Sequence, residues 1–247
     1  MHNSITDVKG FTCWGAHVGI RSKRRDLAVI HSEKPANAAA VFTKNVVVAE
    51  PVKISREHVK NGIIQTVVVN SGNANACTGK QGREVALRTA EVVAEELGVK
   101  VEDVLVSSTG IIGEPLDINI IESGLKNKVI PKLSNRRIAG TLTANTILTT
   151  DTFPKEGYTG FSVGKKNITM AGIAKGSGMI HPDMGTMLAF IVCDIAISRN
   201  LLSETLREIN EKTFNMISVD GDTSTNDMVA VLCNGAAGNK EIKSRED

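Results

Sequence analysis

The sequence predicts a layered α/β fold. Three observations lead to this prediction: apolar runs of strand length alternate with amphipathic segments of helical period, several of these runs are apolar throughout, and 247 residues are enough for one large domain or two small ones. A strand that is apolar on both faces needs cover on both sides of its sheet, which further layers provide. No internal repeat or low-complexity linker divides the chain.

The first half of the chain contains four strand patterns and one helix pattern. We expect strands at residues 26–31, 38–43, 66–70 and 104–107. The segment 32–36 has the composition of a turn between the first two strands, and the segment 108–113 is expected to be a loop after the fourth. Residues 81–97 predict a helix, because apolar residues recur on one face and Gly98 follows the last of them.

The second half continues the alternation. We expect strands at residues 159–163, 168–173, 188–197 and 228–232, and helices at residues 135–148 and 202–217. The run at 188–197 is almost wholly apolar, so both faces of that strand should be buried. The inward face of the last helix is expected to carry Leu202, Leu206, Ile209 and Met216.

The overall composition argues against several function classes. A formal net charge of +2 gives no reason to expect attraction to nucleic acid or membranes, and 3% aromatic residues cannot build the stacking platforms of single-strand binders. No apolar run reaches the length of a membrane span, and the first residues lack the basic and apolar blocks of a signal peptide. The four cysteines lack metal-ligand spacing and predict reduced thiols in a cytoplasmic protein; they are Cys13, Cys77, Cys193 and Cys233.

The segment from Lys175 to Ile191 carries the strongest functional signal. It is rich in glycine and runs through Gly185–Thr186 into an apolar run, which puts a threonine at the mouth of a buried strand. A cut before this threonine would leave its own α-amine, with an ordinary pKa of about 8, beside its hydroxyl as a general base. Gly185 suits such self-cleavage because glycine tolerates a strained backbone. The alternative is an ordinary turn before a strand.

Three further features have both a functional and a structural interpretation. Thr109 and Gly110 follow a strand, where a hydroxyl and backbone N–H groups can face an oxyanion or form an ordinary turn. Lys175 is either a ligand for a substrate carboxylate, able to lower the pKa of a nearby amine, or a solvated surface lysine. The hydroxyls and carboxylates at 149–152 and 221–227 suit a polar substrate, but they are also common in caps and turns.

Eight motifs run in one order along essentially the whole chain. They are Gly10-Phe11, Val41-Phe-Thr-Lys-Asn45, Val69-Asn-Ser-Gly-Asn-Ala-Asn-Ala-Cys-Thr-Gly79, Ser108-Thr-Gly-Ile-Ile-Gly113, Thr149-Thr-Asp-Thr-Phe-Pro-Lys155, Lys175-Gly-Ser-Gly-Met-Ile180, Met184-Gly-Thr-Met-Leu188 and Gly221-Asp-Thr-Ser-Thr-Asn-Asp-Met228. In this order they resemble the glutamate N-acetyltransferase/ornithine acetyltransferase family of arginine biosynthesis. Each motif alone is weak, and together they are specific.

The resemblance implies an autoprocessed acyltransferase with a layered α/β sandwich fold and chemistry like that of N-terminal-nucleophile hydrolases. Residues 1–185 would be its α chain and residues 186–247 the start of its β chain, after a cut between Gly185 and Thr186. Its substrates would be small molecules, N-acetylornithine and glutamate, with acetyl-CoA as an alternative acetyl donor. The resemblance implies no cofactor or metal, no nucleic-acid or membrane partner, and a homo-oligomer of αβ units.

The resemblance also implies a role for each candidate site residue. Thr186 would be the nucleophile that carries the acetyl group. Thr109 and Gly110 would form the oxyanion hole. The amino-acid substrate would contact Thr152, Lys175 and Thr186.

The chain departs from the family pattern in two places. Similar members carry alanine where this chain has Gly185, a change that should still permit the cut. Family members also continue beyond the equivalent of Asp247, where they supply a substrate-binding glutamate and a terminal asparagine and threonine. Two rival interpretations follow: a self-cleaving aminopeptidase or amidohydrolase with water as the acceptor, and a catalytically inactive, truncated binding module.

Overall fold

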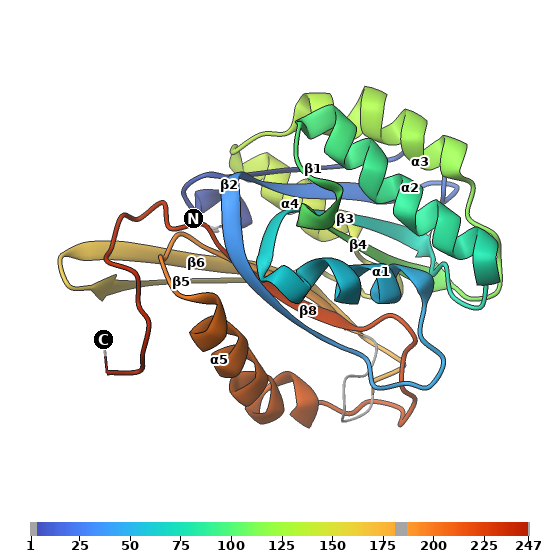
Figure 1. The fold of residues 1–247 in the computed structure, drawn as a ribbon. Helices are drawn as coiled ribbons and strands as arrows, with labels where there is room; N and C mark the ends of the chain where they lie inside the picture. The colour runs from blue at the N-terminus through green and yellow to red at the C-terminus, as the bar shows by residue number, and fades with distance from the viewer. Residues whose placement is uncertain (1–3, 181–186, 247) are drawn as a thin grey trace.

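One sheet, folded along its longest strand, organises the computed structural model (Figure 1). The structure describes residues 4–180 and 187–246, and within them the sheet has eight strands. These are β1 (Phe11–Ala16), β2 (Leu27–Phe42), β3 (Ile63–Asn73), β4 (Val104–Ile111), β5 (Lys155–Val163), β6 (Lys166–Lys175), β7 (Leu188–Cys193) and β8 (Met228–Cys233). Their order in space is β4-β3-β2-β8-β7-β6-β5, and β1 pairs with β2 outside this path.

Five α-helices and six short helical segments connect the described strands. The α-helices are α1 (Glu50–His58), α2 (Gly79–Leu97), α3 (Ile118–Gly124), α4 (Arg137–Thr146) and α5 (Arg199–Lys212). The short segments are η1 (Ile5–Asp7), η2 (Val59–Asn61), η3 (Val101–Asp103), the π-helical η4 (Leu125–Val129), η5 (Ile130–Lys132) and η6 (Phe214–Met216). The predicted helix at 81–97 is confirmed as α2, and Gly98 ends it with a left-handed backbone (φ +66°).

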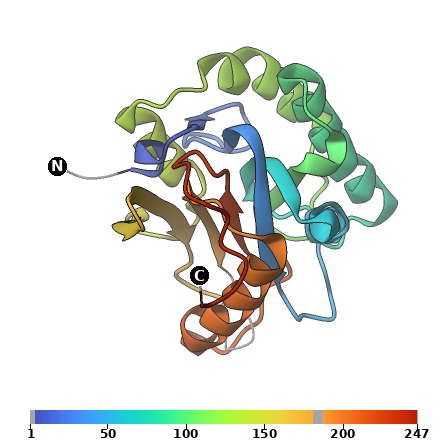
Figure 2. The ribbon, with the colours of Figure 1, turned by 60° about the vertical axis from the view of Figure 1, so that its left-hand side comes forward.

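The two halves of the sheet face each other across a shared apolar core. β2 joins them, since its first part pairs with β1 and β3 and its second part with β8. The shared core contains Val67 and Leu105 from one half, and Phe190 and Ala230 from the other. Because successive side chains of a strand point to opposite faces, the residues between them form two outer cores, one under α2 and α3 and one under α5. Figures 1 and 2 show α2 and α3 on one side of the strands and α5 on the other.

The expectation of two short strands at 26–31 and 38–43 is wrong, because β2 continues through the segment between them. The pairing register with β3 shifts between His31 and Ala36. Pro35 lies within this irregularity and is exposed. A proline lacks the N–H that a regular strand ladder needs, but a β-bulge tolerates a proline. The segment with Pro35 can therefore remain part of the strand and need not form a turn.

The expected inward face of the last helix is half right. Leu202 and Leu206 are buried, but Ile209 is 49% and Met216 is 71% exposed. The helix ends at Lys212, and Thr213 leaves helical geometry (φ −133°, ψ −89°), so Met216 no longer follows the helical period.

Other element boundaries also differ from the sequence prediction. The segment 108–113 is not wholly a loop, since β4 continues to Ile111. β6 continues two residues beyond its predicted end, to Lys175. The sequence analysis missed β1, α1 and α3. The elements β1 and α3 are short, and the main local signal for α1 is Pro51 near its first turn.

The cysteines are free thiols, and all but the exposed Cys77 are buried. None of the helices in the described residues is both long enough and apolar enough to span a membrane.

Candidate active site

A cavity of about 760 Å³ lies where the ends of β3, β4 and β6 come together. Its wall combines hydroxyls, two basic side chains, exposed backbone and a few apolar groups: Ile20, Arg21, Ser22, Gly72, Thr109, Gly110, Ile111, Thr149, Thr150, Lys175, Gly178 and Met179. A cavity of this size with a few convergent polar groups is typical of a small-molecule site.

Thr109 and Lys175 meet in this cavity although 66 positions separate them. Lys175 Nζ donates a hydrogen bond to Thr109 Oγ1 at 3.2 Å, and the two residues are 2% and 4% exposed, in that order. The alternative of a solvated surface lysine is therefore wrong. Lys175 follows Ile173 at a spacing of two along β6, so both side chains lie on the inner face of the sheet.

Two buried carboxyl groups, those of Asp151 and Asp227, act on the pKa of Lys175. Burial lowers the pKa of the Lys175 ammonium, while the charges of Asp151 and Asp227 oppose that effect. Burial acts to raise the pKa of Asp151, but its Oδ1 accepts hydrogen bonds from Lys155 Nζ at 2.5 Å and from the Gly176 N–H at 2.8 Å. These bonds and the Lys175 charge outweigh burial and hold the pKa of Asp151 below its usual value, so it is a carboxylate at neutral pH.

Glycine is required where β3 and β4 end. Gly72 and Gly110 are register neighbours with φ +104° and +141°, and a Cβ on Gly110 would lie 2.3 Å from the backbone carbon of Gly72. No other residue fits there. The cavity wall beside Thr109 therefore consists of bare backbone, which a ligand can approach closely.

Asp227 directs a buried carboxyl group at the chain just after the predicted cut. Gly185 and Thr186 lie outside the described residues, and Met187 follows them. Its N–H, part of the peptide bond with Thr186, donates to Asp227 Oδ1 at 2.8 Å, while Oδ2 has no hydrogen-bond partner in the part of the chain that the structure describes. Burial raises the pKa of Asp227 to about 8. A carboxyl group with such a pKa can gain or lose a proton near neutral pH.

The 221–227 cluster is fastened to the ends of β3 and β4. Asn226 Nδ2 donates to the carbonyl oxygens of Ala74 at 2.7 Å and Ser108 at 2.9 Å. Ser108 Oγ donates in turn to Asn70 Oδ1 at 2.5 Å. Three of the sequence motifs thus meet in one buried hydrogen-bond network, which holds Asp227 next to the cavity wall.

The 149–152 cluster contributes to the cavity through other residues than the predicted one. Thr149 and Thr150 line it, and Thr150 Oγ1 lies 2.7 Å from Ser177 Oγ. Thr152 is exposed and is not part of the wall. Its role in substrate binding stays a prediction.

Arg21 is a candidate that the sequence analysis missed. Its Nη1 donates to the Leu148 carbonyl at 2.7 Å and to Ser71 Oγ at 3.4 Å. Its backbone N–H donates to the buried carboxylate of Asp26 at 2.9 Å, which fixes the loop that carries it. A guanidinium has five N–H donors, so donors remain for a ligand carboxylate. The basic run of residues 21–25 was the available signal.

Within the described residues, no group of three or more histidine, cysteine, aspartate and glutamate side chains is arranged to hold a metal ion. The cavity has several hydroxyls, bare backbone and two cationic groups, which suit an organic ligand with a carboxylate.

Known sequences resemble this chain over most of its length. The ArgJ family model matches residues 12–247. The arginine biosynthesis bifunctional protein ArgJ of Caldanaerobacter subterraneus subsp. tengcongensis is 48% identical over 235 residues, which are 95% of this chain and 58% of that protein. The chain thus spans less than two thirds of this relative's length.

Solved structures also resemble the fold, and two of them are more than 30% identical to this chain in sequence. The arginine biosynthesis bifunctional protein ArgJ from Bacillus halodurans has a TM-score of 0.70 and 41% identity, and the match covers 75% of this chain and 94% of that one. The ornithine acetyltransferase from Mycobacterium tuberculosis, solved with ornithine, has a TM-score of 0.65 and 32% identity, and the match covers 74% of this chain and 95% of that one. The predicted layered α/β fold is confirmed.

Proposed function

The chain belongs to the ArgJ family, and from this premise we propose that it carries the acyl-transfer site of a self-cleaving enzyme that moves an acetyl group from N-acetylornithine to glutamate. The family relatives are named for arginine biosynthesis, which we expect to be the pathway of this chain too, in the cytoplasm. Since the chain spans 58% of such a relative, the rest of the family sequence would complete the enzyme.

Self-cleavage would create the nucleophile. Thr186 Oγ attacks the carbonyl carbon of Gly185, the peptide C–N bond breaks, and the nitrogen takes a proton to become the amine of Thr186. Water then hydrolyses the resulting ester and releases residues 1–185 and 186–247. The Met187 N–H bond to Asp227 would hold the chain on the far side of Thr186 during this attack.

Acetyl transfer would follow in two steps at the same hydroxyl. With the Thr186 amine as general base, Oγ attacks the acetyl carbonyl of N-acetylornithine, and ornithine leaves with the proton. The amine of glutamate then attacks the acetyl–Thr186 ester and gives N-acetylglutamate. The oxyanion of each tetrahedral intermediate would face Thr109 and Gly110, because Thr109 Oγ1 already accepts from Lys175 and its own proton has no acceptor among the described residues.

The buried pair of Thr109 and Lys175 is the observation that carries this proposal. A lysine that is 2% exposed costs free energy to bury, and a stable fold retains it only with compensation. Here it orients a hydroxyl in the wall of a cavity. Together with Arg21, it would also attract the substrate carboxylate. Thr152 would contact the same substrate from the rim.

The lengths of the solved relatives support the cut. A break before Thr186 would leave a larger fragment of 185 residues, and 185/247 is about 75%, the share that the Bacillus halodurans chain covers. That match takes up 94% of the solved chain, as expected of a separate α chain. The ornithine bound by the Mycobacterium tuberculosis relative supports an amino-acid substrate of this class. Acetyl-CoA as a second donor, a homo-oligomer of αβ units and a reaction without a cofactor belong to the same proposal.

Intact mass spectrometry of the denatured protein tests the first step. We expect two fragments that meet between Gly185 and Thr186, and one uncut mass for Thr186→Ala. Product analysis with N-acetylornithine, with and without glutamate, tests the second step. Acetate release that does not respond to glutamate would make the protein a hydrolase, and a wild-type chain that stays uncut on long incubation would support the inactive-module interpretation.

A further inference from the structure

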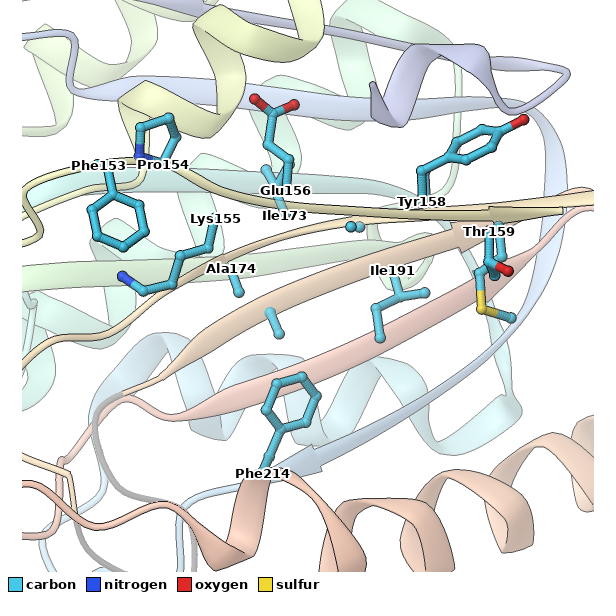
Figure 3. Close-up of a pocket in the computed structure, with 15 residues that line it drawn as sticks. Phe153, Pro154, Lys155, Glu156, Tyr158, Thr159, Ile173, Ala174, Ile191 and Phe214 are labelled. Carbon is cyan, nitrogen blue, oxygen red and sulfur yellow. The ribbon is translucent and has the colours of Figure 1, made fainter. Parts of the chain in front are cut away.

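The second half of the sheet carries an apolar groove that the proposed chemistry does not use (Figure 3). It has a volume of about 670 Å³ and lies between strands β5 to β7 and the turn that follows α5. Its apolar lining includes Phe153, Met170, Ala174, Ala189, Ile191 and Phe214.

The floor of the groove is the outer face of the strands. Figure 3 shows Ile191 and Phe214 pointing toward each other across the groove, while Glu156 and Tyr158 point to the opposite side of β5. By alternation, Gly157 faces the groove. Gly157 pairs with Gly172, which in turn pairs with Ile191. Because the two glycines have no side chain, the floor of the groove lies close to the backbone there. Small side chains of this kind let another element pack close to the sheet.

The helix layer on this side covers only part of the sheet. Leu202 and Leu206 of α5 pack in the core with Val229 and Val231 of β8. Ile209 lies on the flank of α5 and is 49% exposed. Beyond it, seven successive residues of β5 are exposed, and the outer edge of β5 pairs with no strand in the described part of the chain.

We propose that the groove binds an amphipathic helix beside α5, supplied by the part of the ArgJ family sequence that this chain does not span. The length comparison leaves a large share of the family protein to be located, since the chain covers 58% of the Caldanaerobacter relative. Phe153, which lines the groove, is 62% exposed, and water contact with so large an apolar side chain is unfavourable. A helix fits because it would complete the layer that α5 begins.

The groove is connected to the cavity through one side chain. Lys155 lines the groove, and its Nζ donates to Asp151 Oδ1. The same oxygen accepts from the N–H of Gly176, the residue after Lys175. A helix in the groove would therefore restrain the residues that position Lys175.

Glycine substitutions on β5 give a matched test. A Cβ on Gly157 would meet no atom within 4 Å, so a side chain can start there without a backbone clash, and we expect Gly157→Trp to fill the groove. Gly160 faces the other side of the same strand, where a Cβ would meet only the Ile168 carbonyl oxygen at 3.7 Å, so Gly160→Trp is the control. The probe is the part of the Caldanaerobacter relative outside the matched 235 residues, made as a separate polypeptide.

Isothermal titration calorimetry would measure binding of this probe to the 247-residue protein. We expect at least about tenfold weaker binding for Gly157→Trp, because an overfilled groove excludes the helix, and unchanged binding for Gly160→Trp. Equal effects of both variants, or no binding to the unmodified protein, would overturn the proposal. So would a dimer of the chain alone that Gly157→Trp dissociates, which would make a second copy the occupant. None of these readouts depends on cleavage or transferase activity.

Discussion

The cavity and the groove lie on the same sheet but differ in the polarity of their lining and in the space around their glycines. In the cavity wall, Thr109 and Lys175 are buried and bonded to each other, and glycine is obligatory at Gly110. In the groove, the lining is mainly apolar, and Gly157 has open space where a side chain would be. A site made of fixed polar groups and bare backbone suits a small substrate, whereas a flat apolar floor suits the packing of a whole helix.

The largest effect on stability that would test this contrast is expected when Gly110 is replaced by alanine. Gly110→Ala should destabilise the protein by about 3 kcal/mol or more, because the Cβ meets the Gly72 backbone and the residue has φ +141°. Gly157→Ala should change stability by less than about 1 kcal/mol and in the stabilising direction. Urea unfolding followed by circular dichroism measures both. If the two variants lose stability equally, the distinction between the two glycine positions fails.

The sequence predicted most of the elements but not the break after α5 or the continuity of β2. Periodic patterns that glycine punctuates, as at Gly98, depend on local forces and were found. The exposure of Met216 depends on a break in the helix at Thr213, which no local signal announced. The continuous β2 was missed because Pro35 usually marks a turn and here occupies a bulge.

The candidate site divides in the same way. The motif resemblance selected Thr109, Gly110 and Lys175, which the structure brings into one cavity wall. The burial of Lys175 could not be predicted, since it depends on how β6 lies against β4 across the folded sheet. The role of Asp227 was hidden for the same reason: only the fold brings its carboxyl group to the N–H of Met187, 40 positions away.

A second test asks whether the cut before Thr186 depends on the lysine in the cavity or on the lysine in the groove. Lys155 and Lys175 both interact with Asp151, but only Lys175 reaches Thr109. Lys175→Met should slow the cut before Thr186 by roughly a hundredfold, the usual order for the loss of an electrostatic contact at an oxyanion site. It should also lower stability, because the buried carboxyl groups of Asp151 and Asp227 lose the positive charge that faces them. Lys155→Met should leave the rate within about threefold.

Incubation of the purified variants with timed intact mass spectrometry gives both rates. Urea unfolding of the same samples separates a catalytic effect from a folding defect. Equal rates for Lys175→Met and the unmodified protein would remove Lys175 from the machinery. Equal losses in the two variants would mean that the link through Asp151 carries the effect, and the cavity and groove would then act as one unit.

The third effect is expected from Asp227, and it is a gradual dependence of stability on pH. Its pKa is about 8 in the folded protein, above the ordinary value of 3.8, so the folded state binds the proton more tightly than the unfolded state. Stability must then fall as pH rises from about 4 to 8, by at most about 1.4 kcal/mol per pH unit, and level off above the folded pKa.

Asp227→Asn still offers an oxygen to the Met187 N–H but cannot ionise, so its stability should increase relative to that of the unmodified protein over that pH range. The charged group that faces Asp227 is Lys175, whose ammonium opposes the rise of the Asp227 pKa, so Lys175→Met should extend the fall in stability to higher pH without changing its maximal slope. Unfolding free energies of the three proteins at pH 5, 6, 7 and 8 test this prediction. A constant difference between the unmodified protein and Asp227→Asn would mean that this carboxyl group has an ordinary pKa. The fold would then shift the pKa of the polar groups beside the cavity less than the contrast with the groove implies.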